Sequence, residues 1–427
     1  MNDPMKTFRP LPHFARWPRR ILMLAIAGLC VPQLASAATA LPRGEPAAVG
    51  LSAERLQRLG TWAERLQAEG KVSGAVTLVA RRGQVVRFEA QGASDLESRR
   101  PMRGDDIFAI ASMTKPIATV GVLMLLEEQK LLLSDPLEKY LPEFRAPKVA
   151  VARADASDGY VLVPAERSIT IHDLLTHSSG LATGVGLAAG LHREAIGALP
   201  EMAGLAERMK ALATVPLVFQ PGSAFLYGPS TDVLGRVIEV VSGQSLDVFL
   251  QERLFAPLVM NDTGFVVPEE KRSRVAVLYS SVDGAPLSRA QQRVTGRWLH
   301  SAGGGLFSTA PDYLRFCQML LNQGELDGRR YLSRKSIELM TARHVDSIPI
   351  SFLGGQHFGL GVAVQKDDGK SGLLSSPGTY GWSGAYNTYF RIDPKEQLIL
   401  ILMVQRTPGN ILEIQYGFQN LVMQALE

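Results

Sequence analysis

The apolar and polar positions near the start of the chain predict an amphipathic helix followed by a β-hairpin. Residues 53–69 repeat their apolar positions with the period of a helix. Residues 75–80, Ala-Val-Thr-Leu-Val-Ala, and residues 84–88, Gln-Val-Val-Arg-Phe, flank an Arg-Arg-Gly turn. Two β-prone runs around a short glycine-containing turn predict antiparallel strands that pair with each other.

The C-terminal part of the chain returns to strand patterns. Apolar runs at residues 358–364, 386–392 and 397–403 predict three strands, and a terminal helix is expected from about residue 411. The Asp-Pro-Lys-Glu turn at residues 393–396 joins the last two runs, so these strands should be antiparallel neighbours.

Helical patterns interrupted by glycine and proline loops fill most of the chain between these two parts. The predicted sheet therefore draws on residues from about 50–110 and 350–427, and the predicted helical region covers about 120–350. Strands at both ends with helices between them indicate the α/β class. We expect an antiparallel sheet formed by N- and C-terminal segments and flanked by helices, with an inserted, mostly helical region.

The first 37 residues have the order of a secretory signal peptide. Basic residues precede an apolar run at residues 21–31, and small residues follow it. We therefore expect residues 1–37 to be a signal peptide, with cleavage after Ala37 or Ala40, and residues 38–427 to form the folded domain. The expected location is the periplasm or the secreted fraction, without stable membrane association after cleavage. The pattern leaves the export route open.

Removal of this segment changes the charge of the protein. The segment holds five of the 45 basic and one of the 41 acidic residues, so residues 38–427 carry 40 of each. A balanced charge gives no indication of nucleic acid or an anionic membrane as a partner. Cys317 is the one cysteine beyond the segment, which excludes an intramolecular disulfide there. Its apolar helical surroundings predict a core thiol.

The seven histidines do not have the spacing of a metal site. His172 and His177 are five residues apart, whereas ligands on one helix face are three or four residues apart. We therefore expect neither a metal nor another cofactor.

Ser112 and Lys115 form a Ser-x-x-Lys pair at the start of an apolar run that predicts a buried helix. Three residues are close to one helical turn, so both side chains should point to the same side. A serine hydroxyl becomes a strong nucleophile when a neighbouring base takes its proton, and a desolvated lysine can be that base. Because such pairs also occur by chance, a helix cap followed by a surface lysine is the alternative.

Two further segments could complete a hydrolytic site. Tyr227 precedes a Gly-Pro break and a predicted helix, which fits either a second proton carrier in a cleft or a packed tyrosine. Residues 381–386, Gly-Trp-Ser-Gly-Ala-Tyr, begin one of the predicted C-terminal strands, and their small side chains expose backbone N–H groups. One such N–H, together with that of Ser112, would form an oxyanion hole. A plain turn into a strand is the alternative.

In their order along the chain, these segments resemble the serine β-lactamase and penicillin-binding-protein superfamily. More narrowly, they resemble the class C β-lactamase-like serine hydrolases, which include the family VIII carboxylesterases. The resemblance spans roughly residues 50–425 and implies a β-lactamase-like fold. The motifs that carry it are Ser-Met-Thr-Lys at 112–115, Ile-Thr-Ile-His-Asp-Leu-Leu-Thr-His-Ser-Ser-Gly-Leu at 169–181, Gln-Pro-Gly at 220–222 leading to Tyr227, Gly-Gly-Gly-Leu-Phe-Ser-Thr at 303–309 and Trp-Ser-Gly at 382–384.

The resemblance implies a catalytic role for three side chains and two backbone groups. Ser112 would be the nucleophile that accepts the acyl group, and Lys115 would be its partner base. Tyr227 would be the second base and the proton donor to the leaving group. The N–H groups of Ser112 and Ala385 would form the oxyanion hole.

The substrate-binding strand of the resemblance maps to Trp382, Ser383 and Gly384, beside Ala385. Penicillin-binding relatives usually have Lys-Thr-Gly at this strand, and Asn two residues after the tyrosine, where this chain has Pro229. The site therefore lacks the lysine that suits a substrate carboxylate and the amide that holds an amide side chain. Trp382 resembles the esterase branch, where an apolar wall suits the acyl or alcohol part of a neutral ester.

Lys370 and His177 also lie in segments that look functional, and we interpret both residues as structural. The Lys-Ser-Gly run at residues 370–372 is similar to Lys-Thr-Gly, but it lies in a polar, turn-like stretch without a strand directly after it, so Lys370 is interpreted as a solvated turn lysine. His177 belongs to a structural loop that recurs in the family, and we interpret it as scaffold. The sequence contains no Gly-x-Ser-x-Gly motif, which would be the main sequence support for the catalytic triad of an α/β-hydrolase.

We therefore expect an exported serine hydrolase that cleaves carboxylic esters through a Ser112 acyl-enzyme. A D-amino-acid peptidase or a weak class C-type β-lactamase is the alternative. A non-catalytic relative that binds peptidoglycan or a protein partner is a third, less favoured hypothesis. The expected partner is a small-molecule ester or amide, and the sequence specifies neither the natural substrate nor the oligomeric state.

Overall fold

The computed structural model describes residues 40–427 except 157–158, 188, 201–202, 283, 293, 295–299, 347, 349–353, 368 and 410–411. The predicted signal peptide at residues 1–37 lies outside the described residues, so its boundary stays a prediction.

Strands from the two ends of the folded chain form one antiparallel sheet, as predicted. Its strand order is β12-β13-β14-β15-β16-β1-β2-β3. The bounds are β1 (Gly74–Arg81), β2 (Gln84–Asp95), β3 (Arg100–Pro101), β12 (Gln356–Phe358), β13 (Ala363–Gln365), β14 (Tyr380–Ser383), β15 (Tyr389–Asp393) and β16 (Leu398–Met403). The pairing of β1 with β16 joins the N-terminal hairpin to the C-terminal strands, which confirms the predicted α/β class with an antiparallel sheet formed by both ends of the chain.

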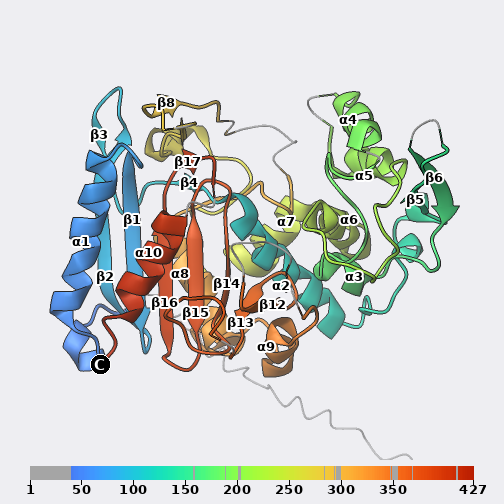
Figure 1. Ribbon diagram of the computed structural model, residues 1–427. Helices are drawn as coiled ribbons and strands as arrows, with labels where there is room; N and C mark the ends of the chain where they lie inside the picture. Colours follow the sequence, from blue (N-terminus) through green and yellow to red (C-terminus); the bar gives the residue numbers. More distant parts are fainter. Residues whose placement is uncertain are drawn as a thin grey trace, which may run out of the picture. The chain divides into compact units, whose positions relative to one another are not determined.

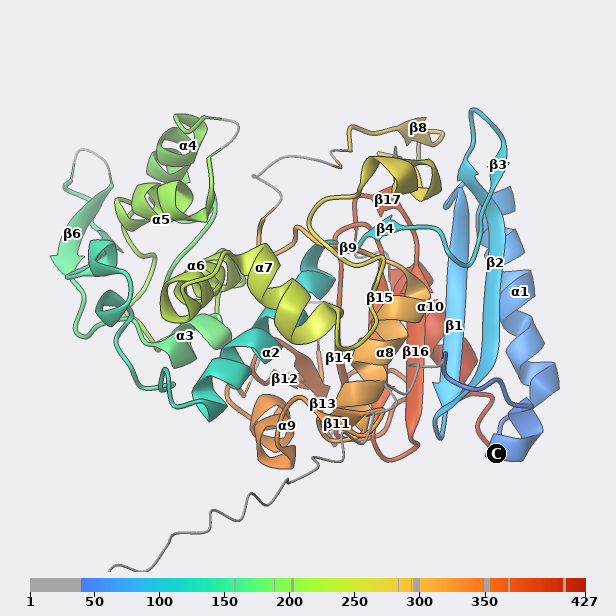
Figure 2. The same ribbon diagram turned by 180° about the vertical axis from the view of Figure 1, so that it is seen from behind.

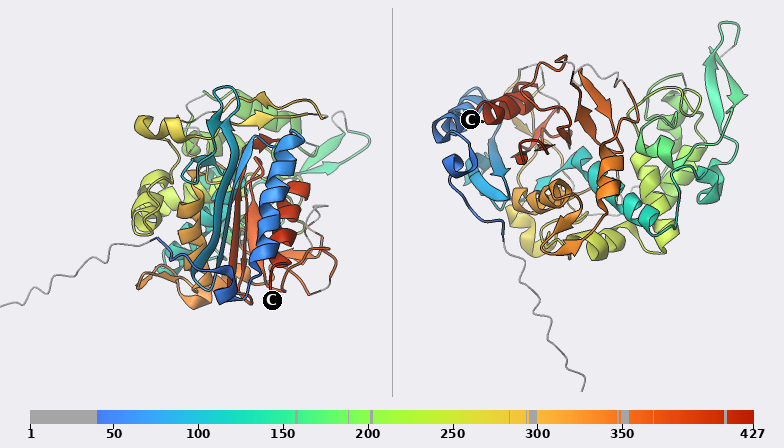
Figure 3. Two further views of the ribbon diagram at one scale, coloured as in Figure 1. Left: turned by 90° about the vertical axis from the view of Figure 1, so that its left-hand side faces the viewer. Right: turned by 90° about the horizontal axis from the view of Figure 1, so that it is seen from below.

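Helices cover both faces of the sheet (Figures 1, 2 and 3). Helices α1 (Ala53–Ala68) and α10 (Leu412–Met423) pack on one face, and α8 (Ala310–Leu321) packs on the other. Side chains of β16 alternate between the two cores, since Leu400 packs with α1 and α10 whereas Ile399 and Ile401 pack in the larger core. This period of two is expected of a strand buried on both faces.

The inserted region between the two sheet segments is mostly helical. Its α-helices are α2 (Thr114–Glu127), α3 (Ile171–Leu175), α4 (Ala189–Gly197), α5 (Leu205–Ala213), α6 (Ser230–Ser242), α7 (Leu246–Leu250) and α9 (Arg334–Thr341), together with α8. Its short strands are β4 (Phe108–Ala109), β5 (Lys148–Ala152), β6 (Tyr160–Pro164), β7 (Tyr279–Ser280), β8 (Ser288–Arg289), β9 (Phe307–Ser308), β10 (Glu325–Leu326) and β11 (Arg329–Arg330), and β17 (Arg406–Thr407) pairs with β7. Helix α2 packs against α6 and is buried on all sides, as its apolar sequence predicts.

Two predicted strands are wrong in their bounds because glycine-rich turns interrupt them. The run at 358–364 is not one strand but the hairpin of β12 and β13, with Gly361 at φ +70° in the turn. The segment at 381–386 does not begin the following strand. Instead Trp382 belongs to β14, which ends at Ser383 and pairs antiparallel with β15. Asn387, at φ +63°, lies in the turn between them.

Among the described residues, no helix is both long and apolar enough to cross a membrane.

Candidate active site

The Ser-x-x-Lys pair lies where a short 3-10 turn, Ala111–Met113, runs into α2. Lys115 Nζ donates a hydrogen bond to Ser112 Oγ at 3.3 Å. Ser112 is half-buried, and Lys115 is only 5% exposed, so the ammonium group is largely shielded from water. Ala111 has φ +44°, a conformation that residues with side chains seldom adopt. Strained backbone conformations of this kind cluster at functional sites.

Side chains from two other elements hold this turn in place. The hydroxyl of Tyr313, from α8, donates to the carbonyl oxygen of Met113 at 2.9 Å. The hydroxyl of Thr388, from the segment between β14 and β15, donates to the carbonyl oxygen of Ile110 at 3.1 Å. The turn that carries Ser112, the candidate nucleophile, is therefore held by hydrogen bonds from both the inserted region and the sheet.

A glycine carbonyl is the second partner of the lysine. Lys115 Nζ donates to the carbonyl oxygen of Gly303 at 2.7 Å. The Gly303 N–H in turn donates to Asp232 Oδ1 at 3.1 Å, and the Ser301 hydroxyl donates to the same oxygen at 2.7 Å. The sequence marked residues 303–309 as a motif, but no pattern of residue types indicates which carbonyl oxygen meets the lysine.

Tyr227 lies against the lysine of the pair. Lys115 Nζ is 4.5 Å from the centroid of the Tyr227 ring, within the range of a cation–π contact. The Trp382 indole N–H donates to the phenol oxygen of Tyr227 at 3.1 Å, and the two rings are 5.3 Å apart. The structure thus brings Ser112, Lys115, Tyr227 and Trp382 together from three distant segments of the chain.

His177 supports the tyrosine from behind. Its ring centroid lies 4.7 Å from that of Tyr227, and its backbone oxygen and Nδ1 accept the N–H groups of Leu226 and Gly228 at 2.9 and 3.4 Å. Burial lowers the pKa of His177 well below its usual value, and the nearby Lys115 charge acts in the same direction. A buried, neutral ring that accepts a backbone N–H fits the scaffold interpretation.

The turn between β14 and β15 lies against the base of the serine turn. A Cβ on Gly384 would come within 2.4 Å of the Ile110 carbonyl oxygen and 2.1 Å of Thr388 Oγ1, so only glycine fits this approach. Ser383 is half-buried and Ala385 is exposed. The Ala385 amide, which the resemblance assigns to an oxyanion hole, therefore lies in the turn that contacts Ile110, two positions before Ser112.

Pro229 and Trp382 distinguish the site from that of the penicillin-binding relatives. Pro229 is buried and caps the start of α6, and Trp382 is 5% exposed in β14. Lys370 is exposed in the segment between β13 and β14. Cys317 lies in the core on α8, where burial raises the pKa of its thiol well above the usual value.

The assembled groups fit nucleophilic chemistry with two proton carriers. The Lys115 amine contacts both the Ser112 hydroxyl and the ring of Tyr227. Ser112 and Lys115 lie at the N-terminus of a buried helix, where backbone N–H groups favour negative charge. Within the part of the chain that the structure describes, no three His, Cys, Asp or Glu side chains gather as metal ligands would.

The chain matches known proteins over most of its length. A beta-lactamase family model matches residues 59–415. Protein Rv1367c of Mycobacterium tuberculosis (strain ATCC 25618 / H37Rv) is 40% identical over 352 residues, which is 79% of this chain and 87% of that protein. Esterase EstB of Burkholderia gladioli is 33% identical over 358 residues, 78% of this chain and 86% of EstB. The solved structure of EstCE1, described as a hydrolase with promiscuous acyltransferase activity, aligns with a TM-score of 0.73 at 26% identity, covering 87% of this chain and 98% of EstCE1.

These matches confirm the predicted β-lactamase-like fold. The family match spans the sheet, the inserted helical region and every residue of the candidate site. The chain belongs to the beta-lactamase family, and it is a serine hydrolase of the superfamily that also contains the penicillin-binding proteins.

Proposed function

We propose that this protein is an exported carboxylesterase that cleaves uncharged esters through an acyl-enzyme on Ser112. The observation that carries the proposal is the contact of Lys115 Nζ with both Ser112 Oγ and the Tyr227 ring. Esterase EstB, 33% identical, and the lovastatin esterase of Penicillium rubens, 35% identical over 268 residues, support ester cleavage as the reaction.

In the first step, Lys115 without its proton takes the proton of the Ser112 hydroxyl. The 3.3 Å separation of the two atoms allows this transfer. Ser112 Oγ then forms a bond to the carbonyl carbon of the ester, and the carbonyl oxygen becomes an oxyanion. The N–H groups of Ser112 and Ala385 stabilise that oxyanion.

Collapse of the tetrahedral intermediate breaks the bond to the alkoxide. Tyr227 gives its phenol proton to the departing oxygen, so that a neutral alcohol leaves, and the phenolate is stabilised by the Lys115 ammonium and the Trp382 N–H. Tyr227 then takes a proton from water, and the hydroxide attacks the acyl carbon. The bond to Ser112 Oγ breaks, and the proton held by Lys115 returns to the serine.

The lining of the site favours esters over β-lactams and peptides. Trp382 places an apolar ring where penicillin-binding relatives usually have a lysine, and Pro229 offers no side-chain hydrogen bond to a substrate amide. Lys370 is exposed in a separate segment, which supports its interpretation as a turn lysine. An alkoxide is also an easier leaving group than an amine.

Turnover of matched substrates tests the proposal. The purified protein without residues 1–37 is assayed with p-nitrophenyl butyrate, with nitrocefin and with a peptide ending in D-Ala-D-Ala, beside Ser112→Ala. We expect turnover of the butyrate ester alone, and none in the variant. Rapid nitrocefin hydrolysis would replace the esterase proposal with a β-lactamase, and an active Ser112→Ala protein would exclude the mechanism.

Export is the second part of the proposal, and the N-terminal pattern supports it. The chain expressed from residue 1 in a Gram-negative host is expected to accumulate in the periplasm or the medium with Ala38 or Leu41 as its first residue. N-terminal sequencing of the recovered protein checks this, and a cytoplasmic protein that retains residues 1–37 would contradict it.

A further inference from the structure

The carboxylate of Asp232 lies behind the lysine of the site without touching it. Asp232 is the third residue of α6, and its Oδ1 accepts hydrogen bonds from the Ser301 hydroxyl at 2.7 Å and from the Gly303 N–H at 3.1 Å. The carbonyl oxygen of the same Gly303 accepts the bond from Lys115 Nζ at 2.7 Å. One glycine thus connects the carboxylate to the ammonium group.

Hydrogen bonds at two places hold the glycine-rich loop at residues 301–306, and those to Asp232 are at the first place. At the other end, the Leu306 N–H donates to Thr114 Oγ1 at 3.2 Å, and the Ile110 N–H donates to the Leu306 carbonyl oxygen at 3.0 Å. The bonds at this second place join the loop to the serine turn and to the start of α2. The Gly303 carbonyl lies between the two places, so its position depends on both.

The loop and the carboxylate approach each other closely, so that a side chain at Gly303 would make one of them shift. A Cβ on Gly303 would lie 2.9 Å from Asp232 Oδ2 and 3.3 Å from its carboxyl carbon. The position of the carboxylate also suits its charge, since the first turn of a helix favours a negative group. These contacts give Asp232 a fixed place from which it holds the loop.

Asp232 also couples the lysine to the tyrosine. Tyr227 precedes the N-terminus of α6 by three residues, and Asp232 lies in the first turn of that helix. The segment that presents the phenol therefore also holds the carbonyl that binds Lys115 Nζ. This coupling sets the position of the amine between Ser112 Oγ, at 3.3 Å, and the Tyr227 ring, at 4.5 Å.

We infer that Asp232 is a positioning residue of the reaction, which holds the Gly303 carbonyl so that Lys115 stays aligned with both Ser112 and Tyr227. The inference rests on the proposed function. It assigns to Asp232 an effect on turnover rather than on substrate binding, because its carboxylate contacts the Ser301 hydroxyl and the Gly303 N–H and acts only through the loop. Small displacements of a reacting group cost about 100-fold in rate.

Three variants at this contact test the inference with p-nitrophenyl butyrate. Asp232→Ala removes the acceptor and is expected to lower kcat about 100-fold while KM changes less than about threefold. Asp232→Asn keeps an oxygen that accepts both hydrogen bonds, so it should retain kcat within about tenfold of the unaltered protein. In Gly303→Ala, the added methyl group pushes the loop away from the Asp232 carboxylate, so this variant should resemble Asp232→Ala.

A buried carboxylate outside the site provides the control. Asp135 accepts a backbone N–H from Leu132 at 2.7 Å and a hydroxyl from Tyr140, and it also forms an ion pair with Lys139 at 2.9 Å; these partners of its carboxylate all lie in the segment after α2. Asp135→Ala should lower the free energy of unfolding without lowering kcat. A comparable loss of kcat in Asp135→Ala and Asp232→Ala would mean that the effect is only one of stability, which would overturn the inference.

The rate at which a fluorophosphonate probe labels Ser112 gives a readout that needs no substrate. We expect labelling of Asp232→Ala and Gly303→Ala to slow in parallel with kcat, and that of Asp232→Asn to stay close to the unaltered rate. If Asp232→Ala fails to fold, Gly303→Ala and Asp232→Asn carry the test. Unchanged labelling in Gly303→Ala, or a kcat of Asp232→Ala within about threefold of the unaltered protein, overturns the inference.

Failure of the inference is distinguishable from failure of the proposed function. If Ser112→Ala is inactive while Asp232→Ala turns over normally, only the role of Asp232 is wrong. If Ser112→Ala is itself active, the acyl-enzyme proposal is wrong whatever the Asp232 variants do.

Discussion

At the scale of single residues, the site depends on one amine that three other groups share. Lys115 Nζ reaches the Ser112 hydroxyl, the Gly303 carbonyl oxygen and the face of the Tyr227 ring. A lysine held by three partners in a shielded place has few alternative rotamers, so little entropy is lost when the reaction begins. The arrangement supports the proposed mechanism, in which no histidine acts as the base.

Removal of either proton carrier should disable turnover without unfolding the protein. General acid–base groups contribute about 100- to 10,000-fold in rate, so Lys115→Ala and Tyr227→Phe should each lower kcat for p-nitrophenyl butyrate by about 1,000-fold. Steady-state kinetics and thermal unfolding of both variants check this. A Tyr227→Phe protein within tenfold of the unaltered rate would remove the phenol from the mechanism.

The indole N–H of Trp382 should contribute to rate through the tyrosine. Trp382→Phe keeps an aromatic wall but removes the donor that lies 3.1 Å from the Tyr227 oxygen. A hydrogen bond worth about 1 to 1.5 kcal/mol corresponds to about a tenfold fall in kcat. Kinetics with a neutral ester measure the effect.

Trp62→Phe is the matched control for this substitution. Trp62 is buried on α1, on the other face of the sheet, and its N–H has no hydrogen-bond partner among the described residues. We expect it to leave kcat unchanged. Equal kcat values in the Trp382→Phe and Trp62→Phe proteins would show that the N–H of Trp382 does not act on the phenol.

At the scale of elements, the sequence predicted segments with strong periodic patterns better than it predicted turns. Helix α1, the hairpin of β1 and β2, and the antiparallel pair β15–β16 form as predicted because each has a regular apolar spacing. The run at 358–364 was predicted as one strand because its apolar content hides the turn at Gly361. Trp382 was predicted to begin the strand that is β15, but it lies in the preceding strand, β14. The turn between these two strands was not recognised in the sequence.

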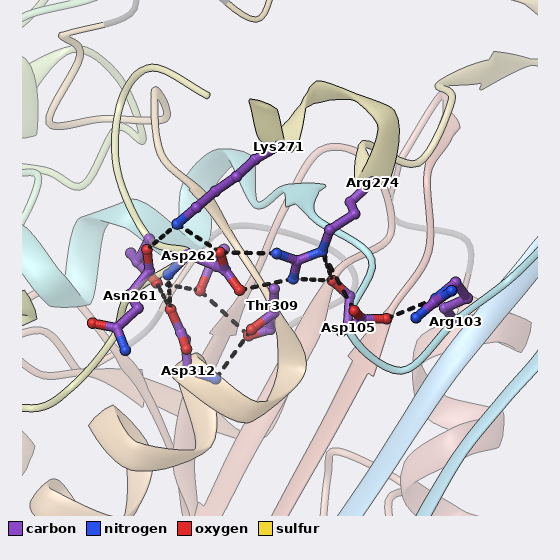
Figure 4. Close-up of polar contacts among 10 residues, drawn as sticks. Arg103, Asp105, Asn261, Asp262, Lys271, Arg274, Thr309 and Asp312 are labelled. Carbon is purple, nitrogen blue, oxygen red and sulfur yellow. Dashed lines mark hydrogen bonds and ion pairs between the residues drawn. The ribbon is translucent and has the colours of Figure 1, made fainter. Parts of the chain in front are cut away.

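The N-terminus of α8 contains a carboxyl group with an unusual environment (Figure 4). Asp312 accepts the Asp262 N–H at 2.7 Å and the Thr263 hydroxyl at 2.9 Å, beside the ion pairs of Asp262 with Lys271 and Arg274. Burial raises the pKa of Asp312 to about 6, although these hydrogen bonds act in the opposite direction. The folded protein therefore holds this proton more tightly than the unfolded chain does.

The pKa of Asp312 predicts the sign of a pH effect on stability. Because its pKa is higher in the folded than in the unfolded state, its contribution is fully present below the unfolded value of 3.8 and is lost as pH rises through about 6. Asp312→Asn removes this dependence. Relative to the unaltered protein, the variant should gain about 1 kcal/mol in free energy of unfolding between pH 5 and pH 8.

Urea unfolding of both proteins at the two pH values measures the difference. A difference between the two proteins that is the same at pH 5 and pH 8 would show that the carboxyl of Asp312 is already ionised at pH 5.

At the scale of the whole molecule, buried histidines should set the acid limit of stability. Burial lowers the pKa of both His177 and His172, and the neighbouring His344 lowers that of His172 further. The unfolded chain therefore binds these protons more tightly than the folded one. Their contribution to stability is present above the unfolded pKa of about 6.5 and is lost as pH falls below it.

His177→Asn tests this origin of acid sensitivity. Asparagine tolerates the φ of +54° at this position and still offers an oxygen to the Gly228 N–H, but it does not titrate. We expect the variant to be less stable at pH 7.5, because of the lost ring packing, yet to lose less further stability on transfer to pH 5. Parallel stability curves for the two proteins would assign the acid sensitivity to other groups.

The candidate site shows how far sequence reasoning can reach. Ser112, Lys115 and Tyr227 were found because their chemistry is a property of residue type and spacing, and the structure brings them into contact. Gly303 was part of a predicted motif, but the role of its carbonyl and that of Asp232 were not predicted, because both depend on which backbone group meets which side chain. Such contacts arise only when α6, the 301–306 loop and α2 are packed together.

The central claim is that an ester leaves its acyl group on the oxygen of Ser112. We would mix the purified protein with p-nitrophenyl butyrate, quench with acid within the first turnovers, and measure the intact mass and the peptide that carries the adduct. We expect one added butyryl group on the peptide that contains Ser112, absent from the Ser112→Ala protein. Full ester turnover by Ser112→Ala, or a butyryl group on another residue, would contradict it.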